Sequence, residues 1–469
     1  MTDLVIRDAE VDGVSGVDVA ITGGRITAVG PNLVAPSTAA VIGADGGALI
    51  PGLHDHHLHL HAMAADAASV RCGPPHVRDA AALATALGHS AGDDNGWVRG
   101  VGYIETVAGD LDADRLDRLH SARPVRVQHR SGAMWVLNGA AVTATHLNEA
   151  THPGVERAPD GRPTGRVWRA DTWLRDRLPP SRPPRLHTVG ATLTRLGVTG
   201  VTDATPDLTP QSRSAIEASI ADGSLPQRVH LLGAPPDFES VSPAARLTVG
   251  PYKIVLADSS LPALDDLAAR IRRVHDRGRA VAVHCVTREA LLILLAVLDE
   301  VGTIPGDRIE HGALIPAETI EDLHRRGLTV VTQPGFLADR GDDYLRDVDK
   351  RDRPDLYRCR SLIGAGVPVA LSSDAPYGPL DPWAVITAAV TRRAPTGEII
   401  GSNERITAAE ALTRYLTPAD KPGGTPRHIR VGATADMVLL CAPLADILAA
   451  PAADAVQATL IGGRWAYPD

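Results

Sequence analysis

The sequence predicts an α/β protein built on a parallel (β/α)8 TIM-like barrel, with a small β-domain built from both termini and a long insertion after the first barrel strand. Three observations support this prediction. Eight short apolar segments alternate with helix-like runs through the middle of the chain. Strand-like segments with glycine-rich turns occupy both termini. The first two apolar segments are separated by far more chain than an ordinary βα connection needs.

Both ends of the chain have the pattern of short β-strands. Apolar and polar residues alternate in LVIRDAEV, VDVAITGG and RITAVG near the N-terminus, and in ADMVLLCAP and ATLIGGRWAY near the C-terminus. This period of two is typical of strands that bury one face. We therefore expect residues 1–50 and 425–469 to form one small β-domain together.

The barrel is expected over residues 51–424. Helical periodicity marks runs such as 261–278 and 288–302, which lie between the strand candidates. An open doubly wound sheet is the alternative, but no glycine-rich dinucleotide fingerprint follows the first strand. The strand candidates are GALIPGLHDHHLHL, GVTGVTDA, RVHLLGA, YKIVLAD, AVAVHC, DRIEHG, TVVTQP and PVALSSDAP.

Residues 62–187 form the insertion between the first two barrel strands. A helix is predicted over residues 78–91 and strands over 123–132 and 163–171. Long insertions at the C-terminal ends of barrel strands commonly shape the substrate pocket. We expect this role here, and a packing subdomain without a catalytic role is the alternative.

Composition narrows the classes of function. The 469-residue chain has a net charge of −9 and no long basic block, so nucleic acid is not an expected partner. No stretch approaches the roughly 18 apolar residues of a membrane helix, and no signal-peptide core follows the N-terminus. The four scattered cysteines form no CxxC pair. We expect a cytoplasmic protein that acts on a small molecule without a membrane partner; its oligomeric state stays open, with a homodimer among the possibilities.

The segment HDHHLHLH is a candidate metal site on the first barrel strand. Because alternate residues of a strand face opposite sides, Leu58 and Leu60 suit the side that packs against helices. Asp55, His57 and His59, with His61 as a further possibility, then face the barrel axis, and two imidazoles two residues apart can bind one metal ion. Histidine clusters are also found as polar loop ends, so this segment alone leaves the site open.

Four later strand candidates each end with a further possible ligand. Lys253, His284, His311 and Asp374 occupy these positions. Each has an ordinary alternative, because a lysine can snorkel, a histidine can bond to backbone and an aspartate can cap a helix. The C-terminal ends of barrel strands converge at one mouth, so their joint occurrence favours a shared metal site.

These motifs resemble the amidohydrolase superfamily, in the branch that includes N-substituted formamide deformylases (the amidohydrolase 3 type). PGLHDHHLHL is similar to that family's PGFxDxHxHL segment, and GPYKIVLAD, VAVHCVTREAL, RIEHGALI and SSDAPYGPLDPW resemble its successive barrel motifs. The terminal pieces RITAVG, ADMVLL and GGRWAY look like its flanking β-sandwich, which implies that fold for the domain of residues 1–50 and 425–469. The resemblance covers nearly the whole chain. It implies a metal-dependent hydrolase that cleaves a non-peptide C–N bond in an amide, formamide or cyclic amide.

The resemblance also implies a centre of two zinc ions, with other divalent metals as possibilities. His57, His59 and Asp374 would bind one ion, while His284 and His311 would bind the second. Hydrolysis would use water activated to hydroxide by the bound metal.

Lys253 would bridge the two ions as a carboxylated lysine, and Asp374 would be the catalytic base. Carboxylation needs a neutral amine, which an apolar site favours. Lysine occurs elsewhere only at Lys350 and Lys421, although Lys and Arg together number 47. A lysine within an apolar strand therefore suggests a role that arginine cannot fill.

One departure from the family concerns the substrate. In QHRSGAMWVLNG, Ala133 stands where the family segment has a histidine thought to hold or polarise substrate. His129 is the nearby candidate replacement, with an ordinary strand residue as the alternative. Tyr103, Trp135 and Asp203 are further candidate substrate-binding residues, although tyrosine and tryptophan are more often core residues.

Two other functions remain open from the sequence. A mononuclear deaminase of a heterocyclic amine would share the barrel, although it would not need a bridging lysine. A catalytically silent barrel, kept as a binding or assembly protein, is the third possibility. Metal analysis separates them, because two ions, one ion and none are expected respectively for the hydrolase, the deaminase and a barrel without metal.

Overall fold

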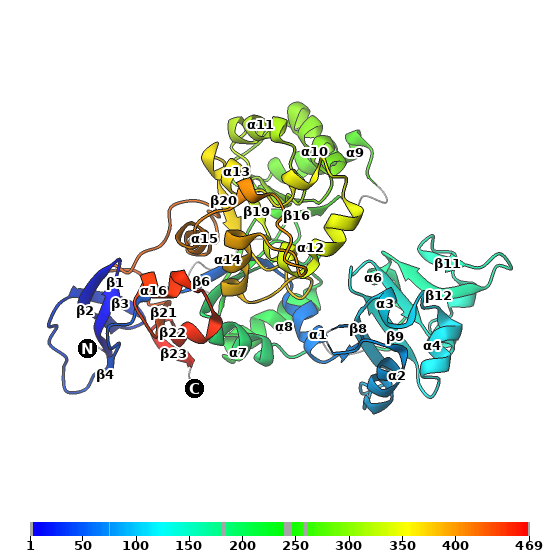
Figure 1. Ribbon diagram of the computed structural model, residues 1–469, viewed down its shortest axis with the longest axis horizontal. Coiled ribbons are helices and arrows are strands. Elements are labelled where there is room, and N and C mark those ends of the chain that lie inside the picture. The colour runs from blue at the N-terminus through cyan, green and yellow to red at the C-terminus, as the bar shows by residue number, and fades with distance from the viewer. Residues whose placement is uncertain (1–2, 75, 181–183, 239–245, 257–260, 468–469) are drawn as a thin grey trace. The chain divides into compact units, whose positions relative to one another are not determined.

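The computed structural model describes residues 3–74, 76–180, 184–238, 246–256 and 261–467 (Figure 1). The chain has the mixed α/β fold that its sequence predicts. It divides into two compact units, of which the first comprises Met1–His61 and Arg185–Asp469 and the second comprises Ala62–Pro184. The expected boundaries of the β-sandwich domain, the barrel and the insertion stay predictions.

Each of the eight predicted barrel segments contains a strand, and these strands form two parallel sheets together with one short strand that was not predicted, β15 (Leu247–Val249). Residues 257 and 258 of the YKIVLAD segment lie outside the described residues. The first sheet has the order β15-β14-β13-β6, with β6 (Leu53–Leu58), β13 (Val198–Asp203), β14 (Arg228–Leu231) and β15 (Leu247–Val249). The second runs in chain order through β16 (Tyr252–Val255), β17 (Val281–Cys285), β18 (Arg308–His311), β19 (Thr329–Thr332) and β20 (Val369–Leu371).

Backbone hydrogen bonds connect these two sheets on both sides. The amide of Lys253 in β16 donates to the carbonyl of Leu232, which directly follows β14, at 3.0 Å. The amide of Asp374, which follows β20, donates to the carbonyl of His57 in β6 at 2.8 Å. β15 and β16 are separated only by residues 250 and 251, and both bond to β14 or to the residue after it, so together they count as one of eight barrel strands. Continuous pairing across both edges would close an eight-stranded barrel, and that closure stays a prediction.

Helices pack against the apolar face of the second sheet. Ile254, Val283 and Ile309 are buried in one cluster with Leu267 of α9 and Leu294 of α10. Because strand residues alternate between faces, Lys253, His284 and Glu310 face away from these helices. The helices of this unit are α7 (His187–Arg195), α8 (Pro210–Ala221), α9 (Leu264–His275), α10 (Arg288–Val301), α11 (Ile320–Arg325), α12 (Gly335–Asp347), α13 (Arg360–Gly364), α14 (Pro382–Thr391), α15 (Ala408–Tyr415) and α16 (Leu444–Ala449).

The two ends of the chain share a sheet. β5 (Leu49–Pro51) pairs antiparallel with β21 (Met437–Leu440), and the sheet order is β23-β22-β21-β5, with β22 (Val456–Ile461) and β23 (Arg464–Tyr467). A second sheet has the order β3-β2-β1-β4, with β1 (Leu4–Val11), β2 (Val14–Thr22), β3 (Arg25–Gly30) and β4 (Ala40–Gly43). Apolar side chains of both sheets, such as Ile6 and Met437, belong to one buried cluster, so the two termini depend on a common core.

The second unit has its own six-stranded sheet, in the order β11-β12-β10-β9-β8-β7. The predicted helix at 78–91 is α2 (Ala80–His89), which Asp79 caps by accepting a hydrogen bond from Ala82 N–H. The predicted strands at 123–132 and 163–171 contain β9 (Val125–His129) and β12 (Pro163–Trp168). The other strands and helices are β7 (Val70–Arg71), β8 (Val98–Tyr103), β10 (Met134–Leu137), β11 (Val155–Arg157), α3 (Glu105–Ala108), α4 (Ala113–Leu119), α5 (Gly139–Ala144) and α6 (Asp171–Arg175), with α1 (Leu60–Ala67) leading into the unit.

Among the described residues, every helix is too short or too polar to cross a membrane.

Candidate metal centre

The residues predicted as metal ligands lie on four strands or directly after a strand end. His57 lies in β6 and His59 follows that strand, while Asp374 follows β20. The remaining three, Lys253, His284 and His311, lie in β16, β17 and β18. All these strands are parallel within their sheets, so their C-terminal ends share one edge of each sheet.

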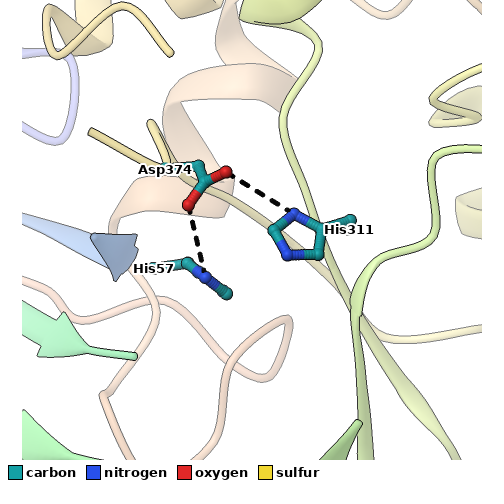
Figure 2. Close-up of side chains that lie close together, drawn as sticks. All are labelled: His57, His311 and Asp374. Carbon is teal, nitrogen blue, oxygen red and sulfur yellow. Dashed lines mark ion pairs between the residues drawn. The ribbon is translucent and has the colours of Figure 1, made fainter. Parts of the chain in front are cut away.

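Three of these residues form a compact group. One possible ligand atom from each of His57, His311 and Asp374 lies within 4.8 Å of the other two. Figure 2 shows the Asp374 carboxylate facing both imidazoles, with Oδ1 3.5 Å from Nε2 of His57 and Oδ2 3.8 Å from Nδ1 of His311. Each of the three residues is at most 7% exposed.

The other three predicted ligands adjoin this group. Nε2 of His59 lies 3.2 Å from Oδ1 of Asp374, and Nζ of Lys253 lies 3.4 Å from Nε2 of His57. The ring centroids of His284 and His311 are 4.5 Å apart. The structure therefore brings all six predicted residues together, and their assignment as ligands stays a prediction.

The electrostatics of the group fit a divalent cation. Burial lowers the pKa of His57 and of His311 well below the ordinary histidine value, which leaves both imidazoles neutral with a lone pair to offer. Burial lowers the pKa of Lys253 to about 8. Oδ1 of Asp374 is buried and accepts no hydrogen bond from any described residue. A buried carboxylate oxygen without a donor is costly, and a bound cation would compensate for it.

Two of these residues have unusual backbone conformations. His311 has a φ of 71° and Asp374 a φ of 55°, both in the left-handed region that non-glycine residues rarely adopt. The Asp374 turn is held by hydrogen bonds from the amides of Tyr377 and Gly378 to the Asp374 carbonyl, at 2.9 and 3.2 Å. Such strain is typical of functional sites, where surrounding contacts impose it.

The sequence prediction assigned no role to several buried polar residues beside the group. Nδ1 of His57 contacts the carboxylate of Glu310, which also accepts a hydrogen bond from Arg308. Nδ1 of His311 lies 3.0 Å from Oε1 of Gln333. Asp55 accepts hydrogen bonds from the amides of His57 and Ser373, and burial raises its pKa to about 7.

The predicted substrate-binding residues each have a polar partner within their own unit. In the second unit, Tyr103 donates to the Gly109 carbonyl at 2.5 Å, and His129 contacts Ser131 and Glu105.

Trp135 in the second unit donates from Nε1 to Asp171 at 2.8 Å. Asp203 in the first unit accepts hydrogen bonds from the amides of Leu60 and Thr205, at 2.8 and 3.1 Å. These bonds satisfy the polar atoms of the buried residues Tyr103, Trp135 and Asp203, whereas His129 is only half-buried. A contact with substrate stays a prediction for each.

Residues 40–467 match the model of the Amidohydrolase family. The chain is 25% identical over 511 residues to the N-substituted formamide deformylase of Arthrobacter pascens, with 94% of this chain and 93% of that protein covered. It is 23% identical over 515 residues to Protein LONG AFTER FAR-RED 3 of Arabidopsis thaliana, which covers 96% and 88% of the two chains. A solved structure, that of an uncharacterized metal-dependent hydrolase from Pyrococcus horikoshii OT3, has a similar fold, with a TM-score of 0.75, 17% identity and 99% coverage of both chains.

Proposed function

This chain belongs to the amidohydrolase family, and we propose that it hydrolyses a non-peptide C–N bond, in an amide, formamide or cyclic amide, at a centre of two divalent ions. Family membership confirms the enzyme class that the sequence motifs indicated. The observation that carries the proposal is the position of the Asp374 carboxylate, whose Oδ1 lies 3.2 Å from Nε2 of His59 and 3.5 Å from Nε2 of His57.

The donor set suits zinc. Imidazole nitrogens and carboxylate oxygens are ordinary zinc ligands, and both kinds are present in the group. We propose that His57, His59 and Asp374 hold one ion and that His284 and His311 hold the second. When bound, the metal supplies Lewis-acid polarisation of the substrate carbonyl and lowers the pKa of water.

Lys253 is proposed to bridge the two ions as a carboxylated lysine. The amine must be neutral to react with CO2, and burial lowers its pKa to about 8, which makes the neutral form accessible near neutral pH. Its Nζ lies 3.4 Å from Nε2 of His57, so the group that would be carboxylated faces the predicted ligands. Electron density at Lys253 in a crystal of the metal-loaded protein tests this proposal.

The chain's own residues would handle the proton of the reaction. Hydrolysis adds water across the C–N bond, so the attacking water loses one proton and the departing nitrogen gains one. Oδ1 of Asp374 has no hydrogen-bond donor among the described residues and can accept that proton. Asp374 would then deliver this proton to the leaving nitrogen, so the transfer needs no further proton from solvent.

The two parallel sheets are proposed to form the (β/α)8 barrel, on the support of the backbone bonds from Lys253 to Leu232 and from Asp374 to His57. The strand ends that carry the candidate ligands would then surround one opening, as in other barrel enzymes.

A hydrolysis screen with the zinc-loaded, full-length protein tests the proposed function. Formamides, hydantoins, lactams and N-acyl amines are incubated with the protein, and the released amine or carboxylate is quantified by chromatography. Cleavage of any of these amides, with two ions per chain by metal analysis, supports the proposal. Release of ammonia from a heterocycle without amide cleavage, with one ion per chain, would replace it by a deaminase. A metal-free chain that cleaves nothing would replace it by a silent barrel.

A further inference from the structure

We propose that Glu310 and Gln333 are positioning residues that give the two ion sites of the metal centre unequal affinities. Glu310 makes His57 a stronger ligand, while Gln333 leaves His311 a weaker one. The ion in the half of the centre that contains His57 is therefore held more tightly than the ion in the half that contains His311. This inference rests on the proposed function, because it requires a metal centre at these histidines.

Glu310 uses both carboxylate oxygens within the protein. Oε2 contacts Nδ1 of His57, and Oε1 accepts a hydrogen bond from Nε of Arg308 at 2.5 Å. All three residues are at most 1% exposed. Because a carboxylate only accepts hydrogen bonds, Nδ1 of His57 must carry the proton and Nε2 must carry the lone pair.

The lone pair of His57 is thereby directed at the centre. Nε2 lies 3.4 Å from Nζ of Lys253 and 3.5 Å from Oδ1 of Asp374. The opposite tautomer would place a proton between these groups and would prevent ligation by Nε2. Glu310 therefore selects the tautomer of His57 that can bind an ion.

Arg308 holds Glu310 in this position. The two residues are two apart in β18, so their side chains lie on the same face of the strand. Nη2 of Arg308 also donates to the His56 carbonyl in β6 at 3.3 Å. The guanidinium thus neutralises the buried Glu310 carboxylate, and through its second hydrogen bond it holds this carboxylate beside the strand that carries His57.

Gln333 occupies the corresponding place beside His311, but without a charge. Its Nε2 donates to the hydroxyl of Ser372 at 2.9 Å, which directs Oε1 at Nδ1 of His311, 3.0 Å away. Nδ1 of His311 is therefore the donor, as in His57. The acceptor is a neutral amide oxygen, and hydrogen bonds to neutral acceptors are weaker than those to carboxylates.

The two acceptors should give the histidines different strengths as ligands. A carboxylate behind an imidazole raises its basicity, and loss of such a partner typically weakens metal affinity by about 10–100-fold. We therefore expect two loading steps, in which the first ion enters the half that contains His57 and the second enters the half that contains His311.

Cobalt titration of the metal-free, full-length protein tests this inference, with calorimetry and visible absorption as readouts. Wild type should bind two Co²⁺ ions in steps whose dissociation constants differ by about tenfold or more. Glu310→Gln should weaken the tighter step by about 10–100-fold and leave the looser step unchanged. Gln333→Glu should tighten the looser step.

Glu404→Gln is the matched control. Glu404 is also a buried carboxylate paired with an arginine, since it accepts from Nη1 of Arg358 at 2.6 Å, and its other partners are Ser361 and Cys359. None of these is a candidate ligand. This variant should lose stability without a change in either dissociation constant.

Three outcomes overturn the inference: wild type loads both ions with equal affinity, a folded Glu310→Gln variant keeps the tighter step, or Glu404→Gln changes that step equally. If circular dichroism shows that Glu310→Gln is unfolded, the wild-type steps and Gln333→Glu decide. A wild type that binds no Co²⁺ refutes the proposed metal centre itself, which distinguishes that failure from unequal halves alone.

Discussion

The amide of Asp374 donates a hydrogen bond of 2.8 Å to the carbonyl of His57, so the turn that carries the acidic side chain is fastened to the strand that carries the histidine motif. The same two residues face each other through their side chains, with Oδ1 of Asp374 3.5 Å from Nε2 of His57. Backbone and side chain together therefore fix the carboxylate against the imidazole before any ion or substrate binds.

Asp374→Asn should lower kcat by about 100-fold or more and leave the fold intact, because an amide has nearly the same shape but cannot accept a proton. Steady-state kinetics and circular dichroism check this. Asp381→Asn is the control, since Asp381 caps α14 and asparagine is an equally good cap, so activity should be unchanged. A fully active Asp374→Asn variant would refute the role of this residue as base.

Lys253→Arg should reduce the metal content below two ions per chain and abolish turnover. A guanidinium stays protonated and cannot form a carbamate, so it would repel the cations that a carboxylated lysine binds. Metal analysis after gel filtration measures the content. The exposed Lys421→Arg variant should keep the wild-type metal content. Two ions and normal activity in Lys253→Arg would exclude a bridging role.

The strands of the fold were predictable because their apolar residues alternate with polar ones. Ile254, Val283 and Ile309 belong to one buried cluster, and each lies beside a polar residue that faces the other way. The connections between the two sheets were not predictable in this way. They depend on backbone hydrogen bonds such as the one from Lys253 to Leu232, which joins two different segments. The alternation of apolar and polar residues within one segment does not specify such a bond.

The candidate ligands could be predicted from their positions at strand ends, whereas their supporting residues could not. Glu310 meets His57 across 253 residues of sequence, so no local pattern joins them. One signal was present: Arg308 and Glu310 flank the apolar Ile309, and this spacing puts two opposite charges on one face of a strand. Gln333 offered no comparable signal, because its role depends on which way its amide points.

Gly73→Ala should destabilise the second unit by about 1–3 kcal/mol, because a Cβ at this position would lie 1.9 Å from the Gly102 carbonyl oxygen. Thermal unfolding followed by circular dichroism measures the change. Gly88→Ala, in α2, is the control: nothing lies within 4 Å of its added Cβ, and alanine should stabilise the helix by about 0.5–1 kcal/mol. Equal stability of the two variants would contradict the close approach at Gly73.

His230 should make the protein sensitive to mild acid. It is 4% exposed, its Nδ1 bonds to the Thr248 hydroxyl at 2.7 Å, and burial lowers its pKa from 6.5 to about 3. The unfolded chain therefore binds a proton between pH 6.5 and 3 that the folded chain does not. The stability contributed by neutral His230 is complete above pH 6.5 and is lost as the pH falls through this window.

The loss amounts to about 1.4 kcal/mol per pH unit for one such histidine, or about 2 kcal/mol between pH 6.5 and 5. His230→Gln removes the titrating group and should reduce the fall in unfolding free energy between pH 7 and 5 by about that amount, as urea denaturation at each pH would measure. The exposed His89→Gln variant should match wild type. If His230→Gln loses as much stability as wild type over this range, burial of a neutral His230 is not a source of the acid sensitivity.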